Sequence, residues 1–114
     1  VRDIIHIDDV CEIILIQIKK FSKIKNELFN IGGGLKNSLS LQDLNDRCKI
    51  ITKNKVTLTK IKKTSIYDIP YYVTDNKKIK KFYKWEPKKN IDTILRDINN
   101  WLTSNKLILK KYFK

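Results

Sequence analysis

The three glycines of the chain are consecutive, at Gly32, Gly33 and Gly34, and directly follow the apolar run Leu28 to Ile31. Glycine reaches backbone angles that other residues avoid, so the triplet predicts a sharp turn. A short apolar run that ends in such a turn is typical of a buried strand. The triplet matches neither G-x-G-x-x-G nor G-x-x-x-x-G-K-[ST]. Two interpretations therefore stay open: a loop that lines a ligand, and a turn with a purely structural role.

Clear helix-start signals occur at Ser40 and at Asn90. Ser40 and Asp43 have the spacing of a capping box, with Leu39 and Leu44 placed as a hydrophobic staple, and predict a helix from about residue 41 to 51. Asn90 precedes the most regular amphipathic pattern in the chain, which also predicts a helix. The apolar positions of that pattern are Ile91, Ile94, Leu95, Ile98, Trp101 and Leu102.

Shorter elements are expected around these helices. Residues 3–7 are rich in β-forming side chains and predict a short strand, after which Asp8 or Asp9 would cap a further helix. The alternation of apolar and polar residues over 56–61 predicts a half-exposed strand, and 71–73 predicts another short one.

The last part of the chain predicts helices and a tail. Asp75 is expected to cap a brief basic helix through Phe82, which the sequence 85–87 (Trp-Glu-Pro) ends. Residues 105–114 mix apolar residues with lysine and predict a basic amphipathic tail. We find no internal repeat and no linker, so the expected fold class is α/β, one unit of helices with a few short strands.

The length of the chain limits what it can do alone. A chain of 114 residues fits one domain and leaves no room for separate cofactor and substrate domains. Hydrophobic residues make up 41% of it, enough for a core. No apolar run approaches the roughly 20 residues that cross a bilayer, so no membrane association is expected. The chain opens at Val1 in the middle of a motif, and we expect it to come from a longer one.

The formal net charge of +13 suggests nucleic acid or an anionic surface as a partner. Planar recognition of phosphates and bases favours arginine, but the basic residues are lysines except for Arg2, Arg47 and Arg96. A chain rich in Lys, Ile and Asn and without Ala indicates compositional drift instead. A nucleic-acid-binding module remains an alternative, however, because Tyr71 and Tyr72 lie near Lys77 and Lys78 in the sequence and could stack on bases.

The residues that most often carry chemistry are few. Cys11 and Cys48 are too few for a zinc site and lie in helical-looking segments, so we expect buried free thiols in a reducing compartment, the cytoplasm. His6 has no Ser or Cys nucleophile in its motif, and a structural role is favoured over that of a base. Capping is likewise the favoured role for Asp8 and Asp9. No catalytic residue and no metal ligand is expected in this chain.

Taken together, the motifs resemble the C-terminal part of an extended short-chain dehydrogenase/reductase, a member of the NAD-dependent epimerase/dehydratase family. Residues 1–10 resemble the family's V-R-D-x-x-H-V-x-D-V segment. Residues 29–34, followed by 37–41, resemble its N-I-G-G-G…S-x-x-E segment. Residues 75–78 with 85–87 resemble its D-x-x-K…G-W-x-P close. The order of the motifs makes the joint signal stronger than any single one.

The resemblance implies a fold and an activity. The C-terminal substrate-binding region would span 1–104, and the tail 105–114, with the Rossmann half missing. Family members oxidise a nucleotide sugar transiently with tightly held NAD and return the hydride to the other face of the ring. Residues 37–41 are most similar to a CDP-hexose 2-epimerase, with UDP-glucose 4-epimerases and dTDP-glucose 4,6-dehydratases as alternatives. The implied partners are a nucleotide sugar, with CDP-hexose favoured, the missing half, and a second copy in the complete enzyme.

The resemblance also implies substrate-binding residues. Arg2 matches the arginine that contacts the nucleotide diphosphate, although an ion pair with Asp3 or Asp9 is an alternative role. Asp68 matches the acidic residue of the family's R-x-x-D segment, which contacts the nucleotide ribose. In this interpretation the backbone at residues 33 and 34, both glycine, lines the site.

The sequence departs from the family at several of these positions. Ser65 stands where the second arginine is expected, so Lys62 or Lys63 would have to supply that phosphate contact. Ile4 stands where some 4-epimerases have an aromatic residue, and Lys84 where the family has a glycine. The family's Gly-rich fingerprint and its catalytic Tyr-x-x-x-Lys pair have no counterpart in these residues. NAD would therefore be bound by the missing half, and none is expected in this chain alone.

Overall fold

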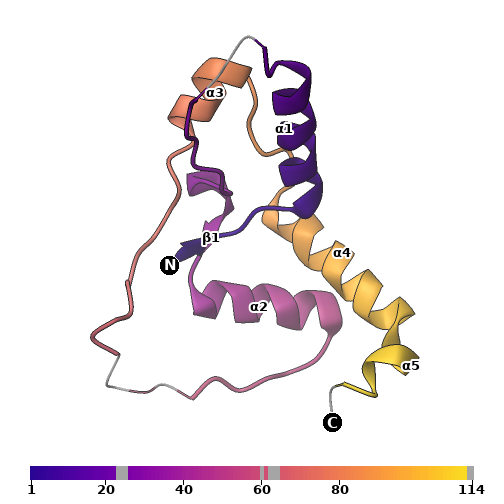
Figure 1. Ribbon diagram of the computed structural model, residues 1–114. Helices are drawn as coiled ribbons and strands as arrows, with labels where there is room; N and C mark the ends of the chain where they lie inside the picture. The colour runs from indigo at the N-terminus through magenta and orange to yellow at the C-terminus, as the bar shows by residue number, and fades with distance from the viewer. Residues whose placement is uncertain (23–25, 60, 62–64, 113–114) are drawn as a thin grey trace.

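A computed structural model of the chain describes residues 1–22, 26–59, 61 and 65–112 (Figure 1). Helices dominate, and the strands are short. In chain order the elements are β1 (Arg2–Asp3), α1 (Ile7–Lys19), the 3₁₀ helix η1 (Leu35–Asn37), β2 (Ser38–Leu39), α2 (Leu41–Thr52), α3 (Lys77–Tyr83), α4 (Ile91–Ser104) and α5 (Lys106–Leu109).

The sheet in the described part of the chain consists of β1 and β2. The two strands are antiparallel, with Arg2 opposite Leu39 and Asp3 opposite Ser38. An isolated parallel bridge joins Arg2 to Tyr72, so the only β-structure in the predicted strand 71–73 is this bridge. The chain is therefore helix-rich with a small two-stranded sheet, as expected of an α/β piece, but with fewer strands than the sequence predicted.

The start of α1 differs from the sequence prediction. The strand predicted for residues 3–7 ends at Asp3, and His6 is the N-cap of α1, where its side chain accepts a hydrogen bond from the Asp8 N–H. The prediction that Asp8 or Asp9 caps the helix is wrong. Both lie in the first turn, where carboxylates interact favourably with the positive end of the helix dipole. An imidazole nitrogen has taken the place of the expected carboxylate cap.

The caps of α2 and α4 are confirmed. Ser40 Oγ accepts from the Asp43 N–H and the Asp43 carboxylate accepts from the Ser40 N–H, both at 3.1 Å, which completes a capping box. Asn90 accepts from the Thr93 N–H at 2.9 Å at the start of α4.

At the start of α3, Asn76 is the N-cap residue, and the carboxylate of Asp75 accepts from the Lys77 N–H. The cap predicted at Asp75 is therefore displaced by one residue. Lys84, where the family has glycine, ends this helix with a φ of 56°.

The strands predicted at 28–31 and 56–61 are not formed in the described part of the chain. Residues 28–31 and 56–59 have no regular secondary structure, and Lys60 lies outside the described residues. Both predictions rested on local patterns, whereas a strand is stabilised only by a neighbour that accepts and donates its backbone hydrogen bonds.

A small core joins α1 to α3. Its fully or almost fully buried members are Ile13, Ile79, Tyr83 and Trp85. Phe29 packs its ring edge-on against Tyr83, with ring centroids 5.2 Å apart. Leu39 of β2 and Ile91 and Ile94 of α4 are also buried.

Much of the molecule lies outside this core. The radius of gyration is 17.4 Å, whereas a compact domain of this length has about 13 Å. Figure 1 shows residues 53–59 and 65–76, described parts of the segment between α2 and α3, outside the helices. Cys11 is exposed and Cys48 half-buried, so the prediction of two buried thiols is wrong. Within the described residues no helix is long and apolar enough to cross a membrane.

Candidate functional site

Arg2 and Asp68, separated by 66 positions in the sequence, meet in the structure. Arg2 Nη2 donates to Asp68 Oδ1 at 3.0 Å, and the two side chains are 48% and 51% exposed. The partner of Arg2 is therefore neither Asp3 nor Asp9. Because the pair is half exposed to water, it contributes little to stability and is readily exchanged for another anion.

The backbone around this pair holds both side chains in place. On one side, β1 fixes Arg2 opposite Leu39. On the other, the Asp68 N–H donates to the Ser65 carbonyl at 3.1 Å in a turn, and the Tyr72 N–H donates to the Val1 carbonyl at 3.0 Å. The loop that carries Asp68 is thereby fastened to the same strand as Arg2.

A cavity of about 310 Å³ opens beside the pair. Its walls are mainly apolar, and one cation and one carboxylate stand at its edge. Apart from the pair and Val1, the lining residues are Ile4, Leu39, Ser40, Leu41, Leu44 and Pro70. The arrangement suits a ligand with a flat, weakly polar part and an anionic part, and the volume is at the lower end for small-molecule sites.

Gly33 and Gly34 lie away from this cavity. They line a separate hollow of about 350 Å³ together with Lys36, Lys80, Lys89 and other residues. A Cβ atom at Gly33 would collide with the carbonyl oxygen of Ile4. The Gly34 N–H donates to Asp3 Oδ2 at 2.8 Å. The structure therefore brings Arg2 and Asp68 together but not the glycines, while Lys62 and Lys63 lie outside the described residues.

Three of the lysines around the second hollow, Lys80, Lys88 and Lys89, are paired with acids. Lys80 binds Glu86, and this hydrogen bond holds the pKa of the Glu86 carboxyl below its ordinary value. Lys88 likewise binds Glu12, whose pKa is lowered by that bond and by a further one from the Trp85 indole. The positive charge of these lysines is therefore partly neutralised, which weakens the hollow as an anion site.

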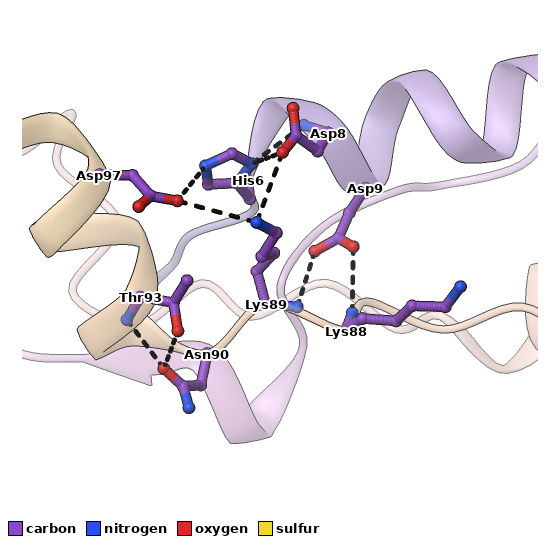
Figure 2. A network of polar contacts seen from close by, with 8 residues as sticks. All are labelled: His6, Asp8, Asp9, Lys88, Lys89, Asn90, Thr93 and Asp97. Carbon is purple, nitrogen blue, oxygen red and sulfur yellow. Dashed lines mark hydrogen bonds and ion pairs between the residues drawn. The ribbon is translucent and has the colours of Figure 1, made fainter. Parts of the chain in front are cut away.

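A polar network around His6 ties α1 to the segment before α4 (Figure 2). His6 Nδ1 accepts from the Asp8 N–H at 3.0 Å, and Nε2 lies 3.3 Å from Asp97 Oδ2. Asp9 is buried and accepts from the backbone N–H groups of Lys88 and Lys89, each at 3.1 Å. These contacts occupy both ring nitrogens with structural partners.

Sequence reasoning missed the apolar lining of the cavity beside Arg2. Leu39, Ser40 and Leu44 were assigned to the start of α2, and the structure shows that they line the cavity as well. The link is the pairing of β2 with β1, which places Leu39 opposite Arg2. The resemblance included both segments, residues 1–10 and 37–41, and this was the available signal. Nothing in the sequence indicated that their strands pair.

Comparison with known proteins gives a limited answer. No protein-family model matches the chain. CDP-paratose 2-epimerase from Salmonella typhi is 32% identical over 108 residues, which cover 91% of this chain and 30% of that enzyme. The match supports a distant relation to that enzyme. The chain spans less than a third of the enzyme's length, so most of the enzyme has no counterpart in these residues.

Proposed function

We propose that this chain is the nucleotide-sugar-binding part of an NAD-dependent epimerase that acts on CDP-hexoses, and that it works with polypeptide beyond these 114 residues. The observation that carries the proposal is the pairing of Arg2 and Asp68 at an apolar-walled cavity. It occurs in a chain that is 32% identical to a CDP-paratose 2-epimerase. The Rossmann half of the resemblance would be the missing polypeptide.

In this proposal the ion pair is exchanged when the ligand binds. The planar guanidinium of Arg2 offers parallel donors to a diphosphate, which carries more negative charge than the single carboxylate of Asp68. Asp68 is then free to accept a hydrogen bond from a ribose hydroxyl. Ile4, Leu39 and Leu41 supply apolar contact for the flat part of the nucleotide.

Among the described residues, the glycine turn does not suit NAD. The Gly34 N–H is already bound to Asp3, and the backbone of Ile4 lies directly against Gly33. In the proposed enzyme NAD, which accepts a hydride from the sugar and returns it, is bound by the missing half. This chain contributes binding and orientation of the nucleotide end of the substrate.

A nucleic-acid-binding module is the second candidate. It is favoured by Tyr71 and Tyr72, which are both exposed. Lys78, however, binds Glu27 and lies over the Phe29 ring, so it is not free for phosphate. Such a module would bind RNA or DNA with an affinity that falls steeply with salt, whereas a nucleotide-sugar site shows no preference for a polymer.

The proposal is tested in a chimera, the Salmonella typhi enzyme with its matching stretch replaced by this chain. We expect the chimera to bind CDP-hexoses more tightly than UDP- or dTDP-hexoses and to epimerise them. Arg2→Ala should weaken binding by on the order of 1.5–3 kcal/mol, about 10- to 150-fold, through loss of a charged hydrogen bond. Arg96→Ala, an exposed arginine on α4, is the matched control. An Arg2→Ala chimera with an unchanged Kd would remove Arg2 from the site.

A further inference from the structure

Helix α1 exposes an apolar stripe. Ile7, Cys11, Ile14 and Ile18 are all exposed. On a helix with 3.6 residues per turn they lie within about 60° of one another, on one side of α1. The opposite side, with Ile13, is buried against α3 and its neighbours. An α-helix with apolar residues on both sides is typical of an element enclosed by protein, so the stripe lacks a partner in the described part of the chain.

The segment 28–31 has the burial pattern of a strand without a neighbouring strand. Leu28 and Asn30 are exposed, whereas Phe29 and Ile31 are half-buried against the core, so the exposure alternates with a period of two residues. Within the described residues, the backbone N–H and C=O groups of Phe29 and Ile31 have no hydrogen-bond partner. A strand alongside would satisfy these backbone groups within the protein.

The free edge of this segment can be identified. Lys78 of α3 donates to the Leu28 carbonyl at 2.9 Å, so the edge that carries the Leu28 groups faces α3. In an extended chain consecutive residues direct their N–H and C=O groups to opposite edges. The groups of Phe29 and Ile31 therefore form the opposite edge.

A groove lies between the C-terminal end of α1 and this segment. It has a volume of about 450 Å³ and is lined by Gln17 of α1, by Phe21, and by Leu28 and Phe29 of the extended segment. Phe21 follows the last turn of α1 and is exposed. We call the stripe, the groove and the strand edge together the docking surface.

From these features we infer that the docking surface accepts a β-strand, which pairs with Phe29 and Ile31, together with apolar side chains that cover the stripe on α1. The occupant is the polypeptide that corresponds to the unmatched part of the epimerase relative. Most of that relative has no counterpart in this chain, and many large apolar residues of this chain are exposed. The inference rests on the proposed function, since it names the partner of the same site.

Hydrogen exchange followed by NMR tests the strand pairing. In the chimera the amides of Phe29 and Ile31 should exchange at least 100-fold more slowly than in the isolated chain, and those of Leu28 and Asn30 should change less. Equal exchange of Phe29 and Ile31 in a folded chimera overturns the inference. Protection in the isolated chain that rises with its concentration would mean pairing with a second copy, and also overturns it.

Charge substitution tests the stripe. Ile14→Asp should lower the melting temperature of the chimera but leave that of the isolated chain unchanged, because Ile14 is exposed there. Ile50→Asp, an exposed isoleucine on α2 outside the surface, is the matched control and should change neither. An Ile14→Asp chimera that melts like its parent contradicts the inference.

A chimera that does not fold is replaced by a second measurement. This chain and the unmatched part of the Salmonella typhi enzyme are then co-expressed as two polypeptides, and we expect them to copurify unless Ile14→Asp is present. Failure of the unsubstituted pair to copurify overturns the inference. Failure of the proposed function would give a different result from failure of this inference. The amides of Phe29 and Ile31 would still be protected from exchange, but the complex would bind no nucleotide sugar.

Discussion

Arg2 and Asp3 are neighbours that serve opposite sides of β1. Arg2 extends toward Asp68 and the apolar cavity, whereas the carboxylate of Asp3 accepts from the Gly34 N–H on the other side. Adjacent residues of a strand point to opposite faces, so one short strand can anchor the glycine turn and present a cation to a ligand. The glycine triplet thereby acquires a structural role: it lets two chain segments cross closely behind the candidate site.

The first prediction concerns that crossing. Gly33→Ala should destabilise the chain by about 1–3 kcal/mol, because the added Cβ would collide with the Ile4 backbone, which the hydrogen bond from the Ile4 N–H to the Asn37 carbonyl holds in place. Urea unfolding followed by circular dichroism measures the loss. Leu35→Ala, an exposed position in the same turn, is the control and should change stability by less than about 0.5 kcal/mol. A Gly33→Ala chain as stable as its parent would show that the crossing is not tight.

Acid should weaken α2 through Asp43. Hydrogen bonds from the Ser40 side chain and backbone lower the pKa of the Asp43 carboxyl below its ordinary value of 3.8. The contribution of Asp43 is therefore fully present above about pH 4 and is lost as the pH falls through the lowered pKa. We expect helicity to be constant between about pH 5 and 7 and to fall below about 4.

Asp43→Asn is the matched variant for this pH dependence. It should reduce the acid-induced loss, measured by circular dichroism at 222 nm, without abolishing it. Glu12, Asp46 and Glu86 also have lowered pKa values, so their contributions to stability are likewise lost as the pH falls. If Asp43→Asn lost as much helicity at low pH as the parent chain, the capping box would contribute nothing to the pH dependence.

At the level of elements, helices were predictable and strands were not. The signals for α2 and α4 lie within the helices: a cap residue, its partner three positions on, and apolar residues at helical spacing. A strand at 28–31 or 56–61 requires a neighbouring strand that is far away in the sequence or absent from it. The short apolar run at 28–31 and the alternation at 56–61 were therefore not sufficient to predict strands. His6 was overlooked as a cap because imidazole is a rarer acceptor there than carboxylate or hydroxyl.

The candidate site also has a part that could be predicted from the sequence and a part that could not. Arg2 and Asp68 were named from family resemblance, and composition or periodicity would not have singled out either residue. Their contact is a product of the parallel bridge between Arg2 and Tyr72, which no local pattern predicts. Gly33 and Gly34 were grouped with Arg2 and Asp68 from the resemblance alone. In the structure the glycines and the ion pair lie on opposite faces of β1 and line different cavities.

The end of α3 offers a stabilising substitution. Lys84 adopts a φ of 56°, which disfavours any residue with a Cβ, and it is exposed. Lys84→Gly should therefore stabilise the chain by about 0.5–1 kcal/mol. This net effect is the backbone strain that is relieved, minus the extra conformational entropy that glycine loses on folding. Lys81→Gly, inside the same helix, should destabilise it by about 1 kcal/mol. Urea unfolding of both variants checks the opposite signs, and a change of the same sign in both would contradict this account of the helix end.

For the whole molecule, the decisive property is how little of its apolar surface is enclosed. The buried core is small, and exposed large apolar residues occur on all five α-helices and on the loops. An apolar residue exposed alone is ordinary, but contiguous apolar surface marks a place where another surface binds. On α1 such residues form the stripe of the docking surface, and the cavity beside Arg2 is open.

Thiol reactivity provides a probe of this arrangement, because the two cysteines lie on different elements. Cys11 belongs to the stripe on α1, and Cys48 is half-buried on α2, outside the docking surface. Reactivity of a thiol depends on its exposure to the reagent, so in the isolated chain Cys11 should be alkylated faster than Cys48, on the order of tenfold.

In the chimera, iodoacetamide labelling followed by mass spectrometry should find alkylation of Cys11 slowed by a similar factor and that of Cys48 unchanged. Slowing of both thiols would indicate general tightening of the fold, and slowing of neither would mean that α1 stays exposed in the complete protein. Only selective protection of Cys11 fits a partner seated on the stripe.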